Sequence, residues 1–294
     1  MMKNYLLLLG LVLSTFSYAQ RDYSQVTITS EQLSENVYVL FGAGGNMALV
    51  TGADQNYLID DQFAPLSDKI LFKIKSLNDK PLAYVLNTHW HGDHTGGNEN
   101  LAKEGALIIA SDRVYDRLKT GQQSARRNTP PAPNTALPVI SFSDQMNLRY
   151  REDAHIHGMH MNDAHTDGDS FYYFPEENVI HLGDNFFNGK YPFIDIDSGG
   201  DIDGLLSNLG MAAAMIDEET KIIPGHGAVG TLADLKAYTH VLETCVTLIK
   251  DLRDEGLSVD EIIDAKPLAA WDDSYGNGFI SPEAFIRSVF ISAD

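Results

Sequence analysis

The sequence predicts an α/β (α+β) protein with one main domain, and three features of the chain lead to this prediction. Short runs rich in β-branched and aromatic residues alternate with segments whose apolar residues recur every three or four positions. Two blocks of this kind follow each other, each with strands first and helices after, and a helical segment of about 231–294 ends the chain. Hydrophobic residues make up 44% of the 294 residues, which is enough to build a sizeable core.

The first 19 residues are predicted to be a secretory signal peptide. Lys3 precedes an apolar run at 6–13, and the small residues Ser17 and Ala19 mark a cleavage site. Eight apolar residues are far fewer than the roughly 20 that a membrane-spanning helix needs. We therefore expect no stable membrane insertion after cleavage and a periplasmic or secreted domain of residues 20–294. Its single cysteine, Cys245, allows no intramolecular disulfide.

The first block begins with three short predicted strands, at residues 37–40, 47–51 and 57–59. Apolar residues at helical spacing predict a helix over 70–77. A buried strand at 83–86 then leads directly into a histidine-rich segment. The next strand is expected at 107–110, with Ser111 as the N-cap of a helix. Four prolines in residues 129–138 indicate a surface loop.

The second block is β-rich over residues 139–182, with a hairpin turn at 175–178. A helix at 202–215 and a strand at 221–223 follow. In the helical end of the chain, Thr231 and Ser258 each begin a capping box, and Ser281-Pro282 begins the last helix. Cys245 lies on an apolar helical stripe and is expected in the core.

The charge balance limits the partners of the protein. The chain holds 41 Asp and Glu against 21 Lys and Arg, so its formal net charge is −20 and its pI is about 4.7. Nucleic acids and anionic membranes attract basic surfaces and repel acidic ones. We therefore expect a small-molecule substrate and no nucleic-acid partner.

A His-x-His-x-Asp-His cluster directly follows the buried strand at 83–86. In an extended backbone, residues two positions apart lie on one face, so His89 and His91 can bind one metal ion while Asp93 and His94 turn toward a second. Three further candidates each follow a β-like segment and stand beside glycine, where the chain turns. They are His165, Asp184 and His226.

The ordered segments THWHGDHTGG, AHTDGD, GDNFF and PGHG resemble the metallo-β-lactamase-fold superfamily of metal-dependent hydrolases, over about residues 37–226. The resemblance implies a four-layer αβ/βα sandwich with C-terminal helices and a dinuclear zinc site, two Zn²⁺ per chain, between its sheets. By position, the first zinc would be held by His89, His91 and His165, the second by Asp93, His94 and His226, with Asp184 as the bridge.

The resemblance also implies a zinc-dependent hydrolase. Imidazole and carboxylate suit zinc and leave positions open for water, whose pKa the metal lowers to about 7. The hydroxide formed there would attack a small carbonyl substrate, namely an ester, thioester, lactone or lactam. Asp93 would be the catalytic residue, because it would orient this hydroxide and later help to protonate the leaving group.

Other residues are expected to support the site. Asp60 matches an acidic residue that ends an early strand in many relatives, and it either accepts a hydrogen bond from a ligand histidine or is a solvated turn residue. His181 is expected in a supporting role, as are His155, His157 and His160. The predicted substrate pocket uses apolar side chains near the metal, although a loop packed on the sandwich is an equal alternative. These side chains are Trp90, Phe187, Tyr191 and Phe193, with Lys190 as a possible contact for a substrate carboxylate.

Several related functions stay open. Family members that are true β-lactamases tend to carry cysteine or serine in place of Asp184, which disfavours a β-lactamase without excluding it. A mononuclear iron sulfur dioxygenase is the alternative from a different class, since that branch keeps the same histidine cluster. A flavodiiron oxygen reductase is disfavoured because His91 replaces a glutamate. A glyoxalase II-like enzyme is disfavoured because residues 257–294 are acidic, and a non-catalytic module because the ligand set has no gap.

Overall fold

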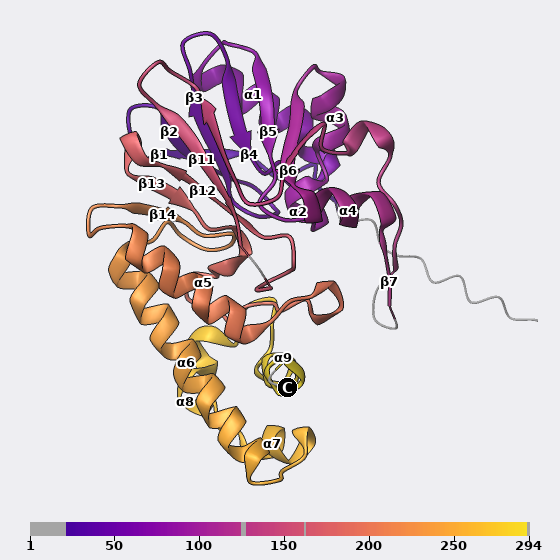
Figure 1. Cartoon of the computed structure of the whole chain (residues 1–294), viewed down its shortest axis with the longest axis vertical. Helices are drawn as coiled ribbons and strands as arrows, with labels where there is room; N and C mark the ends of the chain where they lie inside the picture. The colour runs from indigo at the N-terminus through magenta and orange to yellow at the C-terminus, as the bar shows by residue number, and fades with distance from the viewer. Residues whose placement is uncertain (1–21, 125–127, 162, 293–294) are drawn as a thin grey trace, which may run out of the picture.

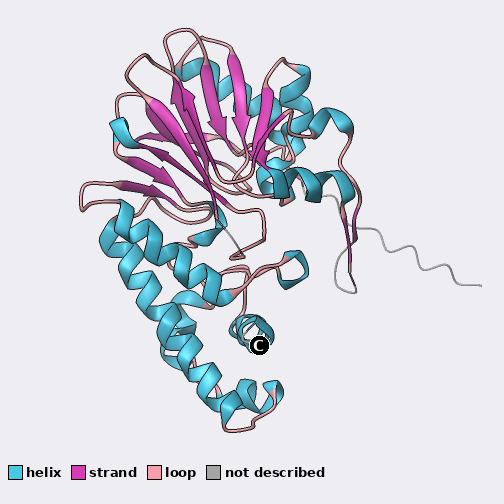
Figure 2. Ribbon diagram, viewed as in Figure 1, coloured by secondary structure: helices cyan, strands magenta, loops and turns pink. Residues whose placement is uncertain are grey.

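The computed structural model of the chain describes residues 22–124, 128–161 and 163–292. Within these residues, two β-sheets stack face to face, and helices cover the outer face of each sheet (Figure 1). The resulting order of layers, helix–sheet–sheet–helix, confirms the predicted four-layer fold (Figure 2). The predicted signal peptide, 1–19, lies outside the described residues. In the described part of the chain, no helix combines the length and apolarity required to span a bilayer.

The first sheet contains seven strands in the order β1-β2-β3-β4-β5-β6-β9. Their bounds are β1 (Thr29–Gln32), β2 (Val37–Phe41), β3 (Met47–Thr51), β4 (Asn56–Ile59), β5 (Leu82–Leu86), β6 (Leu107–Ser111) and β9 (Ile140–Phe142). The pairs from β1 to β4 are antiparallel, whereas β4, β5, β6 and β9 run parallel. Because parallel neighbours end at the same edge, β4 and β5 bring Asp60 and the His89 segment together.

The second sheet has the order β10-β11-β12-β13-β14. Its strands are β10 (Gln145–Arg149), β11 (His155–His160), β12 (Ser170–Phe174), β13 (Val179–His181) and β14 (Lys221–Ile223). Only the last pair, β13 and β14, is parallel. Asp184 and His226 therefore leave the same edge of this sheet, each shortly after its strand ends. A separate short hairpin joins β7 (Gln122–Gln123) to β8 (Asn128–Thr129).

The described helices lie on the two outer faces and at the C-terminal end (Figure 1). They are α1 (Ser67–Leu77), α2 (Gly92–Thr95), α3 (Asn98–Lys103), α4 (Asp112–Thr120), α5 (Ile202–Met215), α6 (Leu232–Asp254), α7 (Val259–Ala265), α8 (Ala269–Tyr275) and α9 (Pro282–Ser292). Ile70 and Ile74 of α1 pack on the outside of the first sheet. Helices α5, α6 and α9 pack on the second, around a core that includes Cys245.

Most predicted elements are confirmed, and three helices were missed. The helix at 202–215 and the strand at 221–223 have the predicted bounds. The Ser111 side chain caps α4, and both capping boxes form. Helices α2, α3 and α8 were not predicted, because they are too short to show an apolar period. The predicted loop at 129–138 also contains a 3₁₀ turn, Asn134–Ala136, that packs against α3.

Candidate metal centre

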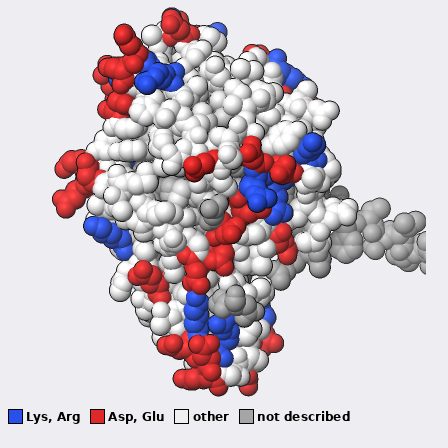
Figure 3. Space-filling model, in the orientation of Figure 1, with Lys and Arg blue, Asp and Glu red and all other residues white. Residues whose placement is uncertain are grey.

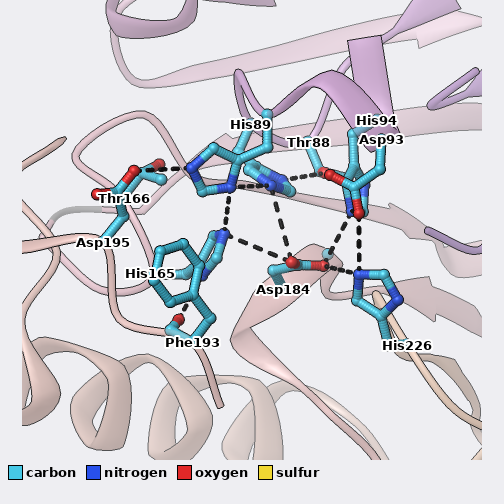
Figure 4. Close-up of polar contacts among 12 residues, drawn as sticks. Thr88, His89, Asp93, His94, His165, Thr166, Asp184, Phe193, Asp195 and His226 are labelled. Carbon is cyan, nitrogen blue, oxygen red and sulfur yellow. Dashed lines mark hydrogen bonds and ion pairs between the residues drawn. The ribbon is translucent and has the colours of Figure 1, made fainter. Parts of the chain in front are cut away.

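The seven predicted ligands meet at one edge of the two sheets, each carried by a segment that follows a strand. The chain leaves β5 extended through His89 and bends into α2 just after His91, so the histidine cluster is split between a loop and a helix. His165 lies between β11 and β12, Asp184 in a 3₁₀ turn after β13, and His226 after β14. Figure 4 shows their side chains converging around Asp184. The structure separates them into two groups of potential metal ligands.

The first group contains His89, His91, His165 and Asp184, all buried. His91 Nδ1 lies 3.1 Å from His89 Nε2 and 2.8 Å from His165 Nε2. Asp184 Oδ2 lies 3.4 Å from His165 Nε2 and 3.8 Å from His89 Nε2. Three imidazole nitrogens and one carboxylate oxygen thus surround a common point.

The second group contains Asp93, His94 and His226. Asp93 Oδ2 lies 3.4 Å from His226 Nε2 and 3.8 Å from His94 Nε2. The other oxygen of Asp184, Oδ1, lies 3.1 Å from His94 Nε2 and 3.5 Å from His226 Nε2. Asp184 therefore faces both groups, one oxygen toward each, which is the bridging position that the sequence resemblance implies.

The donor set and the space around it fit bound metal ions. Ligands held about 2.0–2.1 Å from a tetrahedral ion are roughly 3.3 Å apart, and the donor atoms here are separated by 2.8 to 3.8 Å. His94 Nε2 and Asp184 Oδ1 are buried, yet neither makes a hydrogen bond to any described residue. Glycine keeps the cradle open, since a Cβ on Gly225 would lie 2.0 Å from Asp184 Oδ1 and one on Gly45 would lie 2.1 Å from His94 Cε1.

Asp60 holds the ligands that face the first sheet. Its Oδ2 accepts hydrogen bonds from His94 Nδ1 at 2.7 Å and from the Thr88 hydroxyl at 2.8 Å. The Thr88 oxygen in turn accepts a bond from His89 Nδ1 at 3.0 Å. Asp60 thus fixes the tautomer of His94 directly and that of His89 through Thr88. It does so with a left-handed backbone, φ 60°, that few non-glycine residues adopt.

Two further supports come from the loop after Tyr191. His91 Nε2 lies 2.8 Å from Asp195 Oδ2, which leaves Nδ1 to face the metal site. His165 Nδ1 donates to the carbonyl oxygen of Phe193 at 2.6 Å, and the Asp195 amide donates to the carbonyl oxygen of His165 at 2.9 Å. The sequence analysis missed Asp195, because it stands in a segment without helical or strand period and meets His91 only in the folded chain.

Burial and charge give the ligands the ionisation states that metal binding requires. Burial lowers the pKa of His89 well below its usual range and lowers the pKa of His91 to about 4, so both are neutral near pH 7. Burial would raise the pKa of Asp93, but His94 and His226 lower that pKa to about 2. Burial would likewise lower the pKa of His226, but Asp184 and Asp93 raise that pKa to about 9. The carboxylates therefore create a negative site that attracts a cation.

A pocket of about 650 Å³ opens over the second ligand group. It reaches all four predicted pocket residues, Trp90, Phe187, Tyr191 and Phe193, and also Lys190. Trp90 and Tyr191 are almost wholly buried, and the Tyr191 hydroxyl donates to Asp272, so both serve mainly as core. Phe63 and Phe279 also line the pocket and were missed, because both are remote in sequence from the ligand motifs.

The remaining histidines lie outside the two groups. His181 Nε2 donates to the carbonyl oxygen of Asn46 at 3.0 Å, and its Nδ1 accepts from the Gly183 amide at 3.0 Å, so it supports the turn that carries Asp184. His155 and His157 pair with Glu176 and Asn147. His160 bonds to the carbonyl oxygen of Asp169. The supporting roles predicted for these four residues agree with these contacts.

The fold and its paired His/Asp groups define a metal-binding protein of the αβ/βα sandwich class. The chain belongs to the metallo-beta-lactamase superfamily, whose family profile matches residues 40–226. It is 27% identical over 193 residues to the lactamase-like protein aptB of Emericella nidulans, covering 63% of this chain and 52% of that protein. It is 24% identical over 193 residues to the hydroxyacylglutathione hydrolase GloC of Haemophilus influenzae, covering 65% and 89%. The chain spans about half the length of aptB and of the related adaB of Aspergillus niger.

Solved structures share the fold at low sequence identity. The metallo-beta-lactamase from Pontibacter korlensis superposes with a TM-score of 0.62 at 16% identity, over 74% of this chain and 99% of that one. The DIM-1 metallo-beta-lactamase gives a TM-score of 0.62 at 18% identity, over 75% and 99%. These likenesses establish the sandwich fold and leave the C-terminal part of the chain without a counterpart.

Proposed function

We propose that the protein is a zinc-dependent hydrolase that binds two Zn²⁺ per chain and cleaves an ester, thioester, lactone or lactam. The observation that carries the proposal is the position of Asp184, whose two oxygens face two separate ligand groups at the floor of one pocket. Seven ligands are more than one zinc ion uses. The named hydrolases among its relatives support a hydrolytic reaction.

His89, His91, His165 and Asp184 would hold one ion, and Asp93, His94, His226 and Asp184 the other. Zinc bound there would supply Lewis acidity and a lowered pKa for water. The chain supplies orientation: Asp93 presents a carboxylate oxygen at the pocket, where it can accept a hydrogen bond from the attacking water and pass a proton to the leaving group. The aromatic walls exclude bulk water from the reacting carbonyl.

The test is a substrate screen of the purified protein with metal analysis in parallel. The panel contains nitrocefin, aryl esters, acyl-homoserine lactones and thioesters, and elemental analysis gives the metal content. We expect about two zinc ions per chain and hydrolysis of at least one ester, thioester or lactone. Turnover of nitrocefin alone would identify a β-lactamase. One iron ion with little zinc, and no hydrolysis, would contradict the proposal and favour the sulfur dioxygenase.

The pocket favours an anionic substrate in spite of an acidic surface. Acidic side chains are spread over the sandwich and the C-terminal helices on the face shown in Figure 3, in keeping with the net charge of −20. Bound metal ions are the largest local charges in such a site, and Lys190 adds a cation to the pocket wall. Salt that screens the acidic surface should therefore raise kcat/KM for an anionic ester relative to a matched neutral one. Equal values at every ionic strength would contradict this preference.

The protein is also proposed to act after export, in the periplasm or outside the cell. The support is the composition of residues 1–19, with a basic start, an apolar run and a small-residue cleavage site. Cell fractionation and N-terminal sequencing of the mature chain test this proposal. Recovery in the cytoplasm with an intact N-terminus would contradict it.

A further inference from the structure

One wall of the pocket comes from the C-terminal helical segment. The loop between α8 and α9 carries Phe279, which lines the pocket together with Asp93 and His226. Phe279 is 86% exposed, more than any other large apolar side chain in the described part of the chain. Its position lies outside the 40–226 range that the superfamily shares. An apolar ring so exposed is stabilised only when another apolar group covers it.

The backbone around Phe279 is held firmly on both sides. The Tyr191 amide donates to the carbonyl oxygen of Tyr275 at 3.1 Å, and Lys190 Nζ donates to the side-chain oxygen of Asn277. On the other side of Phe279, Ile280 is buried in the core of the helical layer. The loop is thus tied to the segment that lines the metal site, while the ring of Phe279 projects outward.

A continuous aromatic surface connects Phe279 to the metal ligands. Its ring centroid lies 6.2 Å from that of Phe193, with the planes at 90°. Phe193 in turn lies 5.7 Å from the rings of His91 and His165. A substrate whose carbonyl group reaches the ligand groups can therefore lay an apolar chain along Phe193 as far as Phe279. Lys190 is the only Lys or Arg among the described residues that line this pocket, so most of the wall offers no partner to a charged tail.

We propose that Phe279 recognises the apolar acyl chain of the substrate, so that the C-terminal helical segment selects substrates with a medium-length hydrocarbon tail. The identity of the cleaved bond rests on the proposed hydrolase function. Binding of the tail does not require turnover and can be measured by itself. Phe279 contacts the tail and takes no part in the bond-breaking step.

The first experiment is isothermal titration calorimetry of the zinc-loaded full chain with octanoate and with acetate. Both carboxylates can reach the metal site, but only octanoate reaches Phe279. We expect octanoate to bind at least tenfold more tightly than acetate, and Phe279→Ala to weaken octanoate roughly tenfold without affecting acetate. Phe72→Ala is the matched control, because Phe72 is 78% exposed on α1 and does not line the pocket. Equal octanoate affinity in Phe279→Ala and the wild type would overturn the proposal, as would equal binding of both acids by the wild type.

The second experiment separates this inference from the proposed reaction. With para-nitrophenyl esters, Phe279→Ala should raise KM for the octanoate ester roughly tenfold, leave its kcat unchanged and leave the acetate ester unaffected. If octanoate binding depends on Phe279 but the protein cleaves no ester, thioester or lactone, the hydrolase proposal fails and the tail site stands. If esters are cleaved with the same chain-length preference in both proteins, the tail site fails and the hydrolase stands.

Discussion

Asp93 and His226 differ from the other ligand residues in their exposure to the pocket. Their side chains are 29% and 33% exposed, whereas the other five ligands are 7% exposed or less. A substrate entering the pocket therefore meets the second ligand group first. Asp93 is the carboxylate that can touch both a water molecule and the substrate, which is why its role differs from that of the buried Asp184.

Asp93→Ala should lower kcat by about 100-fold or more even when excess zinc restores full metal content, because the variant loses the group that orients water. His181→Ala should lower kcat much less, since His181 contacts Asn46 and Gly183 and no ligand atom. Steady-state kinetics with metal analysis of each variant checks both expectations. Similar losses in the two variants at equal zinc content would show that the distinction between them is wrong.

Gly225→Ala should reduce the zinc content of the protein. A Cβ at this position would lie 2.0 Å from Asp184 Oδ1 and 2.7 Å from the carbonyl carbon of Gly183, so the turn that carries the bridging carboxylate must move. Such overpacking typically costs about 1–3 kcal/mol. Elemental analysis measures the effect, and Gly92→Ala is the control, because nothing lies within 4 Å of a Cβ there. Unchanged zinc content in Gly225→Ala would contradict the tight fit around Asp184.

At the level of structural elements, the loop from Tyr191 to Ser198 combines two tasks. Its aromatic residues line the pocket, while the Phe193 carbonyl and the Asp195 side chain hold His165 and His91. Asp195 also accepts a hydrogen bond from Ser198 at 2.8 Å, which fixes the carboxylate within its own loop. Changes in this loop are therefore expected to affect metal binding as well as substrate binding.

Asp195→Asn should weaken zinc binding in the first group by about 10- to 100-fold, because a neutral amide supports the His91 ring less strongly than a carboxylate does. Competition with a chromophoric chelator measures the affinity. Asp197→Asn is the matched control, since Asp197 belongs to the same loop but is exposed. Zinc affinity that is the same in Asp195→Asn, Asp197→Asn and the wild type would contradict the role of Asp195.

Sequence patterns predicted the elements that carry the ligands, and they failed for contacts made between distant loops. The ligand motifs follow strands whose apolar runs are clear in the sequence, so both the strands and the motifs could be read. Asp195 and Phe279 carry no such signal, because Asp195 meets His91 across 104 positions and the loop of Phe279 docks onto Lys190 across 87. Only the packing of α8 and α9 beside the sandwich brings Phe279 to the pocket.

At the scale of the whole molecule, the metal centre joins the two halves of the sandwich. His89, Asp93 and His94 follow β5 of the first sheet, while His165, Asp184 and His226 follow strands of the second. An ion bound by both sets connects sheets that otherwise meet through apolar contacts such as those of Ile59, Ile156 and Tyr172. Metal binding is therefore expected to stabilise the entire domain.

Removal of metal by EDTA should lower the Tm by roughly 10 °C, because a ligand present at a thousandfold its Kd contributes about 4 kcal/mol to a domain of this size. Thermal denaturation followed by circular dichroism, with and without the chelator, measures the shift. Addition of excess zinc should restore the original Tm. An unchanged Tm after confirmed metal loss would show that the two sheets do not depend on the ions.

The docking of the 276–281 loop against Lys190 and Tyr191 places the seven ligands and the outermost aromatic ring on separate stretches of the gene. Codons for the ligands all fall between positions 89 and 226, and the codon for Phe279 falls beyond them. Mutation or recombination in the last stretch can therefore alter which molecules are accepted while the reactive chemistry is inherited unchanged. A lineage built on this architecture can diversify its diet one loop at a time.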